Sequence, residues 1–418
     1  MAWFFHQVLM PIVVIGVLVF IHELGHFLVA KWCGVGVVRF SVGFGPSIFR
    51  FRRKETTYQL SVIPLGGYVR MVGDMPDMLT GAQVTDEAVR DQDGEPADLD
   101  AAELTPETLA VLSDRKRWFI EKNFWQRSAI VFAGPLFNFL FAIALIFVVA
   151  LVFGGDRMEE ASIIGKVSPG SPAETAGLTE GDRVTAIDGK PIERWEQLAQ
   201  AIHEGTGQPI EMALERSGQA LTVVVHPQRK ELRLITGEKK AVYLVGITPL
   251  LLHQEVGPGE ALALGFSWTL DNSLLTYQGL WGMLTGNVSP KDLAGPLFIL
   301  DAAGEQSEEG IDRLLRFTAL LSVSLAVLNL LPIPILDGGH LMFFIIEALF
   351  GPISIRKKEY AQGVGMLLLV SLMVFALTND ITRDPKSLGG ETQWDTNEAD
   401  TGAGAAVHES EIKEKTAD

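Results

Sequence analysis

An apolar run from Val8 to Val35 carries a short polar cluster near its far end, and this combination constrains the chain more than any other feature. No charged residue stands between Val8 and Ile21, and the run then reads His-Glu-Leu-Gly-His at residues 22–26. A helix of about 20 apolar residues, rising about 1.5 Å per residue, is long enough to cross a bilayer. The sequence therefore predicts a transmembrane helix over residues 8–33 with ionisable side chains inside it.

The two histidines of this cluster have the spacing of a shared metal site. His22 and His26 stand at i and i+4, so both imidazoles leave the same face of a helix. Glu23 lies beside them, where a carboxylate can accept a proton from water. The same motif occurs by chance on soluble helices. Inside an apolar run, however, a charged residue is costly and is rarely kept without a partner or a function, so the sequence predicts a metal site.

Composition narrows the class of protein. Hydrophobic residues make up 48% of the 418 residues, which is high for a soluble protein. The formal net charge of -17 argues against a nucleic-acid partner, which would call for a basic face. The single cysteine, Cys33, excludes an internal disulfide and a cysteine-rich zinc site, so histidine and carboxylate must hold the metal. The first residues lack a basic segment, which favours a retained first helix over a cleaved signal peptide.

Basic residues set the expected orientation, because they gather on the cytoplasmic side of membrane proteins. Such residues follow the first span, flank the second and precede the fourth. We therefore expect a multi-pass α-helical membrane protein with both termini outside the cytoplasm and an acidic, disordered tail at 379–418. The four predicted transmembrane helices cover residues 8–33, 128–153, 311–340 and 359–378.

Residues 39–71 lack helical periodicity. Apolar Tyr58, Leu60 and Val62 alternate with polar residues, which predicts a half-buried strand in a membrane-associated β-hairpin region. Two interpretations remain open: a small surface hairpin, or a sheet edge near the metal site that pairs with an extended peptide.

Two other segments have a distinct character. Residues 74–114 hold twelve acidic residues against one basic residue, which predicts a solvated cytoplasmic insertion with a short helix near its end. Residues 260–296 mix large apolar and polar side chains, which favours a helical region at the membrane surface.

The second span contains a Gly-Pro pair and an asparagine close to its start. Pro135 removes a helical hydrogen bond, and Asn138 is polar in a lipid environment. We expect these residues to interrupt the helix and to pack against protein or line a cavity.

Residues 156–252 read as a soluble α/β domain between the second and third spans. Strands are predicted at 163–167, 210–214 and 221–225, with helices near 172–178 and 196–202. The order of these elements, together with Gly-Leu-x-x-Gly-Asp at 177–182, resembles a PDZ domain of the bacterial type. The predicted topology places this domain outside the cytoplasm.

Two histidines do not complete a zinc site, which usually has a third protein ligand. Asp337 is the one carboxylate in an apolar stretch at the matching depth, and its alternative role is to cap a helix. Pro332 and Asn329 precede it by about one and two turns, where unwound chain would offer polar groups to a substrate. His340 is either a neighbour of the ligands or an interfacial residue.

Together the motifs resemble those of the site-2 proteases, and within that family the bacterial type that regulates the sigma-E response. The resemblance rests on His-Glu-x-x-His at 22–26 and on Asn-x-x-Pro-x-x-x-Leu-Asp-Gly at 329–338. Further family elements match at Gly66-Gly67-Tyr68 and at Gly134-Pro135-x-x-Asn138. The chain departs from the best-known members in its single PDZ domain and its acidic insertion.

The resemblance implies a zinc metalloprotease of the bacterial inner membrane that cuts transmembrane segments of other membrane proteins. It implies zinc ligands His22, His26 and Asp337, with Glu23 as general base. It further implies that a substrate strand, such as that of an anti-sigma factor after a first cleavage, is held by residues of three segments: Gly66, Gly67, Tyr68, Pro135, Asn138, Asn329 and Pro332. The alternatives from other classes are an inactive PDZ-containing scaffold, which would not need Glu23, and a metal transporter, which would need more intramembrane ligands.

Overall fold

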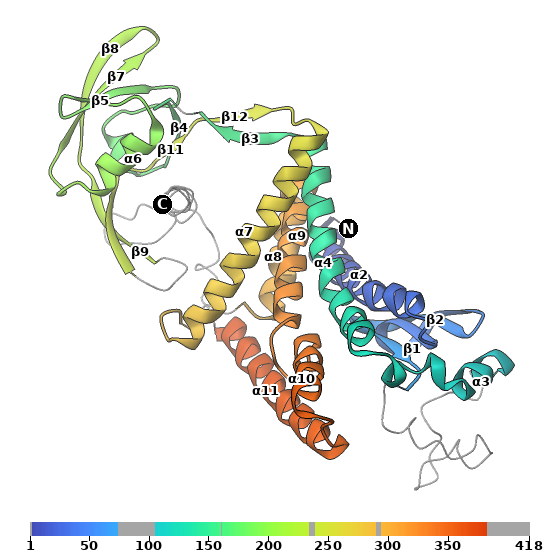
Figure 1. Ribbon diagram of the computed structural model, residues 1–418. Helices are drawn as coiled ribbons and strands as arrows, with labels where there is room; N and C mark the ends of the chain where they lie inside the picture. The colour runs from blue at the N-terminus through green and yellow to red at the C-terminus, as the bar shows by residue number, and fades with distance from the viewer. Residues whose placement is uncertain (1, 74–104, 160, 234–238, 290–293, 383–418) are drawn as a thin grey trace. The chain divides into compact units, whose positions relative to one another are not determined.

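The structure is a computed structural model that describes residues 2–73, 105–159, 161–233, 239–289 and 294–382 (Figure 1). Most of the predicted acidic insertion and nearly all of the predicted tail lie outside these residues. The chain divides into two compact units, which we describe separately. Unit 1 comprises Met1–Val149, Pro258–Thr276 and Ala294–Ile381, and unit 2 comprises Ala150–Gly257, Tyr277–Leu293 and Thr382–Asp418.

Within the described residues, three helices are long and apolar enough to cross a membrane. The first runs from Ala2 to Trp32 and consists of α1 (Ala2–Phe4), a π-helical turn η1 (Phe5–Leu9) and α2 (Met10–Trp32). The others are α4 (Phe124–Phe153) and α11 (Ile355–Thr382). Each begins a few residues before the predicted span, because helical hydrogen bonding continues from the apolar run into the flanking residues.

The predicted third span at 311–340 is corrected to a helix, a loop and a second helix. Helix α9 (Ile311–Asn329) ends at Asn329, and α10 (Asp337–Phe350) begins at Asp337. Two prolines in the intervening loop lack the N–H group that a continuing helix would need. By its length and composition α9 is not among the three membrane-crossing helices of the described residues.

Helix α4 passes through Pro135 without a break, so the predicted interruption is wrong. A proline removes one backbone hydrogen bond, and a helix of 30 residues retains enough others to continue. Helices α2 and α4 approach closely at Gly25. A Cβ atom there would overlap the carbonyl oxygen of Ala133 and lie 3.0 Å from Cβ of Phe137.

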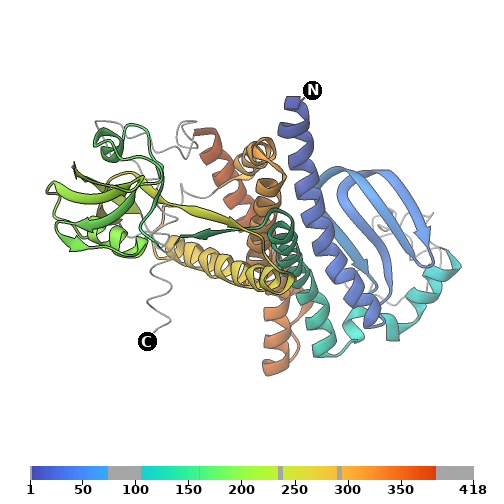
Figure 2. The ribbon, with the colours of Figure 1, turned by 90° about the horizontal axis from the view of Figure 1, so that it is seen from above.

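The hairpin region forms a sheet from two long, bent strands, β1 (Val37–Arg53) and β2 (Thr56–Met71). Phe40 pairs with Val69 on one side and with Tyr58 on the other, so each strand contributes two segments to the sheet. Figure 2 shows these segments side by side next to α2. The segment Gly67–Met71 pairs only with the first part of β1 and is therefore an edge of the sheet as the structure describes it.

The polarity of this sheet is the reverse of the predicted alternation. Thr57, Gln59 and Ser61 are buried, whereas Leu60 and Val62 are 46% and 55% exposed. The buried polar side chains bond to one another: Gln59 Nε2 donates to Ser61 Oγ at 2.8 Å. A sheet in water usually buries its apolar side chains, so the exposed face here is unusually apolar.

The remaining helices outside residues 156–252 belong to unit 1, except that α7 (Pro258–Leu284) begins in unit 1 and ends in unit 2. The predicted surface region at 260–296 comprises α7 and the start of α8 (Pro296–Glu309). The short helix predicted at the end of the insertion is α3 (Pro106–Ser113), which is followed by single turns η4 (Arg115–Arg117) and η5 (Phe119–Glu121). Asp380 of α11 accepts hydrogen bonds from the first backbone N–H groups of α8, those of Leu297 at 3.0 Å and Phe298 at 3.1 Å.

Unit 2 contains the α/β domain, and the predicted strands and helices are confirmed there. A four-stranded sheet has the order β6-β5-β7-β8, and smaller pairs join β4 to β11, β9 to β10 and β3 to β12. Its buried core includes Leu198, Met212 and Leu214. The elements are β3 (Gly155–Met158), β4 (Ile164–Val167), α5 (Pro172–Thr175), β5 (Arg183–Ile187), β6 (Lys190–Pro191), α6 (Trp195–His203), β7 (Ile210–Arg216), β8 (Gln219–Val225), β9 (Gln228–Arg233), β10 (Lys239–Leu244), β11 (Ile247–Pro249) and β12 (Leu251–Gln254).

A partly buried ionic cluster connects the sheet of unit 1 to the helices beside it. Glu55, in the turn between β1 and β2, accepts from Lys31 Nζ at 2.6 Å and from Arg117 Nη2 at 2.8 Å. Burial raises the pKa of the Glu55 carboxyl, but the bonds from the two cations outweigh burial and lower it from 4.5 to about 2. Ionised Glu55 therefore connects the end of α2, the sheet and the segment before α4.

We predict that Glu55→Gln lowers the unfolding free energy by about 1–3 kcal/mol, because charge-assisted hydrogen bonds are lost. A carboxyl whose folded-state pKa is lowered stabilises fully above its unfolded-state pKa. The difference from the unsubstituted protein should thus be complete at pH 7 and shrink as the pH falls from 4.5 towards 2. Thermal unfolding in detergent across this range measures it.

The control is Glu121→Gln, which removes an exposed pair with Arg115 at 3.2 Å. That change should cost less than about 0.5 kcal/mol. Equal losses from the two substitutions would contradict the assigned role of Glu55.

Candidate metal centre

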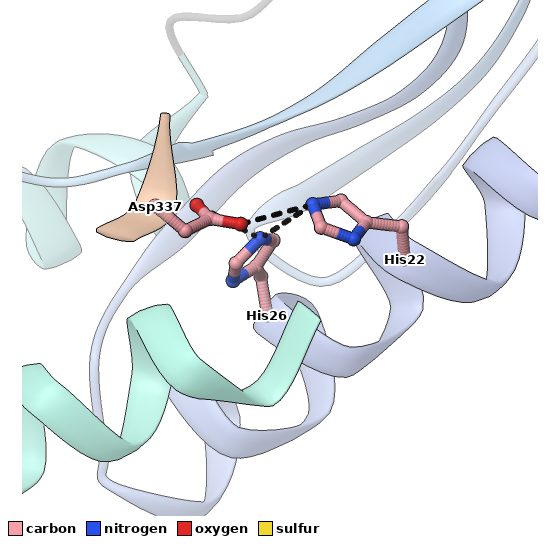
Figure 3. Close-up of side chains that lie close together, drawn as sticks. All are labelled: His22, His26 and Asp337. Carbon is pink, nitrogen blue, oxygen red and sulfur yellow. Dashed lines mark hydrogen bonds and ion pairs between the residues drawn. The ribbon is translucent and has the colours of Figure 1, made fainter. Parts of the chain in front are cut away.

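Two histidines of α2 face a carboxylate from the start of α10 (Figure 3). Their four-residue spacing places both imidazoles on one face of the helix, as predicted. His22 Nε2 lies 3.2 Å from Asp337 Oδ2, and His26 Nε2 lies 3.6 Å from Asp337 Oδ1. The two Nε2 atoms are 3.3 Å apart. The structure thus brings Asp337 next to two histidines that precede it by more than 300 positions in the sequence.

The spacing and chemistry of these atoms fit a zinc ion. Zinc holds nitrogen and oxygen ligands at about 2.0–2.2 Å in a tetrahedron, which places neighbouring ligand atoms about 3.3 Å apart. The imidazole nitrogens are 3.3 Å apart, and each lies 3.2 or 3.6 Å from a different oxygen of Asp337, which is close to this value. Asp337 Oδ2 is buried without a hydrogen-bond donor, as expected for an atom whose partner is a cation. His22, His26 and Asp337 also form a cluster of possible metal ligands within the described residues.

Helix α4 supports the site from one side through residues at four-residue spacing. His26 Nδ1 lies 2.8 Å from the carbonyl oxygen of Ile130, which can only accept, so Nδ1 carries the proton and Nε2 is free to bind a metal. One turn later, Gly134 leaves room for both rings: a Cβ atom there would overlap His26 Nε2 and lie 2.8 Å from His22 Cε1. Another turn later, Asn138 Nδ2 lies 3.2 Å from His22 Nδ1.

Glu23 lies between the metal ligands and the edge of the sheet. A Cβ atom at Gly67 would be 2.9 Å from Cγ of Glu23 and 3.0 Å from Cγ1 of Val19, so only glycine allows the strand to pass this close to α2. Gly66 has a φ of +103°, and a side chain there would overlap the ring of Phe44. The two glycines therefore place an open strand edge beside the predicted general base.

The other predicted site residues occupy different positions. Asn329 is the last residue of α9, and its Nδ2 lies 3.5 Å from His22 Nε2. Pro332 is exposed in the loop between α9 and α10. Tyr68 on β2 accepts a hydrogen bond at its hydroxyl from Arg39 Nη1 at 2.9 Å. Pro135 and Asn138 are buried inside α4, and Asn138 has no exposed surface, which is unlike a residue that contacts substrate.

Three features of the site have no clear signal in the sequence. The bond from His26 ends on a backbone carbonyl, which any residue at 130 would provide. Gly134 was matched as part of a motif, but the space that it leaves for two rings depends on how the helices pack. Ser322 of α9 is buried and donates to the backbone carbonyl of Asn138 at 2.8 Å, and a serine in an apolar helix does not by itself indicate such a partner.

The sequence matches Peptidase family M50 over residues 10–372, and the chain belongs to this family. The match covers all residues of the candidate site. It confirms the prediction of a metalloprotease of the site-2 type.

Curated relatives are similar to this chain along most of their own length. A protein of Agrobacterium fabrum, named provisionally as a zinc metalloprotease, is 36% identical over 89% of this chain and 94% of its own. Zinc metalloprotease RasP of Geobacillus kaustophilus is 32% identical over 89% of this chain and 97% of its own. Protease RseP of Yersinia pestis is 30% identical over 89% and 97%.

We predict that Gly134→Ala removes the metal from the protein. The added Cβ atom would overlap both imidazoles, and the surrounding helices leave the rings little space to move. Metal content of the purified protein, measured by elemental analysis, should fall at least tenfold while the helical circular dichroism is retained.

The matched control is Gly16→Ala, which adds the same atom to α2 at a position with nothing within 4 Å. It should retain full metal content. Normal metal binding by Gly134→Ala would show that the rings are not held against α4 as described.

Proposed function

We propose that this metalloprotease, whose metal is zinc, hydrolyses peptide bonds inside transmembrane segments of other membrane proteins. The observation that carries the proposal is the convergence of Asp337 on His22 and His26, which together with Glu23 lie in an apolar helix that is long enough to cross a membrane. A soluble protease has no need to place its ligands in such a helix. The names of the curated relatives, RasP and RseP among them, support the same assignment.

The residues of the chain have distinct parts in the proposed reaction. His22, His26 and Asp337 hold zinc, which would act as a Lewis acid towards the scissile carbonyl and towards water. Glu23 accepts the proton of the attacking water and returns it to the leaving amine. Asn329, at the end of α9, is placed to bond the substrate near the ligands. Pro332 keeps the following chain out of a helix, so that this side of the site stays open.

Substrate unwinding is the second requirement of this function. A transmembrane helix uses its carbonyl groups in its own hydrogen bonds, so it must unwind before water can attack. The edge segment of β2 around Gly66, Gly67 and Tyr68 offers backbone groups for pairing with the unwound chain. Such pairing would hold the scissile bond beside Glu23, because Gly67 packs against this residue.

The reversed polarity of the sheet supports its position in the membrane. The large apolar side chains Phe49, Ile48 and Val62 are 60%, 66% and 55% exposed. Large apolar side chains with so much exposed surface are unfavourable in water and favourable in contact with acyl chains. We therefore assign the sheet to the bilayer, beside α2, with the Glu55 turn at the cytoplasmic surface.

The wider assignments follow the predicted topology. We propose that α9 with its loop is the fourth membrane-crossing element, and that the chain lies in the inner membrane of a bacterium. The α/β domain at 156–252 has the element order of a PDZ domain, and we propose that it and both termini lie outside the cytoplasm. In this arrangement the substrate would be a membrane protein such as an anti-sigma factor, cut after an earlier external cleavage.

We predict that Glu23→Gln abolishes cleavage and leaves zinc bound, since it removes the proton acceptor without changing a ligand. Turnover of a model transmembrane peptide in detergent should fall by at least 10³-fold, with zinc content unchanged. By contrast, His22→Ala, His26→Ala and Asp337→Ala should lose zinc as well as activity. Undiminished cleavage by Glu23→Gln would refute the mechanism.

We also predict that spin labels on the exposed apolar residues of the sheet are surrounded by lipid. In a Cys33→Ser background, labels at Ile48→Cys and Val62→Cys should be more accessible to oxygen than to a water-soluble nickel complex. A label at Lys54→Cys, in the turn, should show the opposite preference. Electron paramagnetic resonance of the protein in lipid nanodiscs gives both values, and nickel access at all three positions would place the sheet in water.

A further inference from the structure

The contact between Asn138 and His22 Nδ1 indicates that Asn138 has a role other than binding substrate. His22 Nε2 faces Asp337 and His26, whereas Nδ1 faces the side-chain amide of Asn138 at 3.2 Å. A neutral imidazole carries one proton, so a histidine that binds a metal through Nε2 has its N–H at Nδ1. That N–H is buried, and a buried donor left without an acceptor is unfavourable.

The amide of Asn138 is the group that can accept this proton. The structure places Nδ2 next to His22 Nδ1 and leaves Oδ1 buried without a partner. Oxygen and nitrogen of an amide exchange places on a half-turn about the last side-chain bond. The half-turn brings Oδ1 into the position of an acceptor for His22 Nδ1–H, which is the arrangement that leaves Nε2 unprotonated.

His26 also has an acceptor for its Nδ1 proton on α4, two turns before Asn138. Its Nδ1 donates to the carbonyl oxygen of Ile130 at 2.8 Å, so its Nε2 is also directed to the metal position. Ile130, Gly134 and Asn138 stand at four-residue spacing on one face of α4 and contact the two ligands in turn. Helix α4 thus supplies an acceptor for each of the two histidines. Between the two acceptors, Gly134 leaves the space that the rings occupy.

Asn138 also connects the ligand helix to the helix that leads to Asp337. Ser322 of α9 donates from Oγ to the backbone carbonyl of Asn138 at 2.8 Å, and both residues are fully buried. Two turns further, α9 ends at Asn329. The backbone bond and the side-chain bond of Asn138 are independent, so a side-chain substitution removes the support of His22 and leaves the link to α9.

We propose that Asn138 is a positioning residue, which accepts the Nδ1 proton of His22 and so fixes the ring with Nε2 free for zinc. The proposal rests on the zinc site proposed above. Acceptors of this kind are worth about 10–100-fold in metal affinity in other zinc proteins. Because Asn138 is buried behind His22, its loss should weaken the metal and not the binding of substrate.

The test compares Asn138→Leu, which has a similar volume and no acceptor, with Asn138→Asp, which has two. Zinc dissociation constants of the purified, full-length proteins are measured by competition with a chelator, and kcat and KM with a transmembrane peptide. Asn138→Leu should bind zinc about 10–100-fold more weakly, with KM at saturating zinc unchanged. Asn138→Asp should remain within about threefold of the unsubstituted protein.

Three results separate the possibilities. Unchanged zinc affinity with a raised KM in Asn138→Leu would make Asn138 a substrate contact and overturn the proposal. Equal weakening by Asn138→Asp and Asn138→Leu would show that an acceptor is not what His22 needs. If Asn138→Leu does not fold, Asn138→Ser replaces it, because its hydroxyl is too short to reach the ring and should give the same loss. Absence of zinc from the unsubstituted protein would instead refute the proposed function itself.

Discussion

The structure of unit 1 depends on keeping two imidazoles and a carboxylate buried inside apolar helices. Each of these groups is unfavourable in such a setting unless a partner compensates it. His22 and His26 are about nine-tenths buried, so little of either side chain is left for water to solvate. Two kinds of contact compensate them: the three proposed ligands converge on one candidate metal position, and the remaining nitrogens of the two histidines are directed to α4. The packing of α2 on α4 is therefore as much a requirement of the metal site as the ligands themselves.

Close approach of the backbone is the means by which the site is assembled, and glycine permits it at three contacts. Gly25 allows α2 to meet α4, Gly134 receives the two rings, and Gly67 brings the sheet to Glu23. A glycine inside a helix costs about 1 kcal/mol relative to alanine. Gly25 and Gly134 therefore destabilise α2 and α4 as isolated helices. The close packing that the candidate site requires accounts for glycine at both positions.

Much of this site could be predicted from the sequence, because its strongest signals are local or costly. The spacing of His22 and His26 follows from the pitch of a helix, and Asp337 stands out as an acid in an apolar stretch. The break between α9 and α10 was less accessible, since periodicity alone does not tell one long span from two helices joined by a loop. The supporting contacts of Ile130, Gly134 and Ser322 depend on which helices become neighbours, and a single sequence does not contain that information.

The sheet shows most clearly where sequence patterns reach their limit. Alternation along residues 57–62 correctly indicates a strand and correctly sorts its side chains into two faces. It does not say which face is buried, because that choice depends on the solvent. In water the apolar face would turn inward, but here Thr57, Gln59 and Ser61 are the buried residues. Hydrogen bonds such as that of Gln59 to Ser61 satisfy the buried polar face, while the apolar face is free to contact lipid. The same pattern is therefore compatible with opposite orientations in the two solvents, and the long apolar run of the neighbouring helix α2 is the sequence feature that points to the membrane.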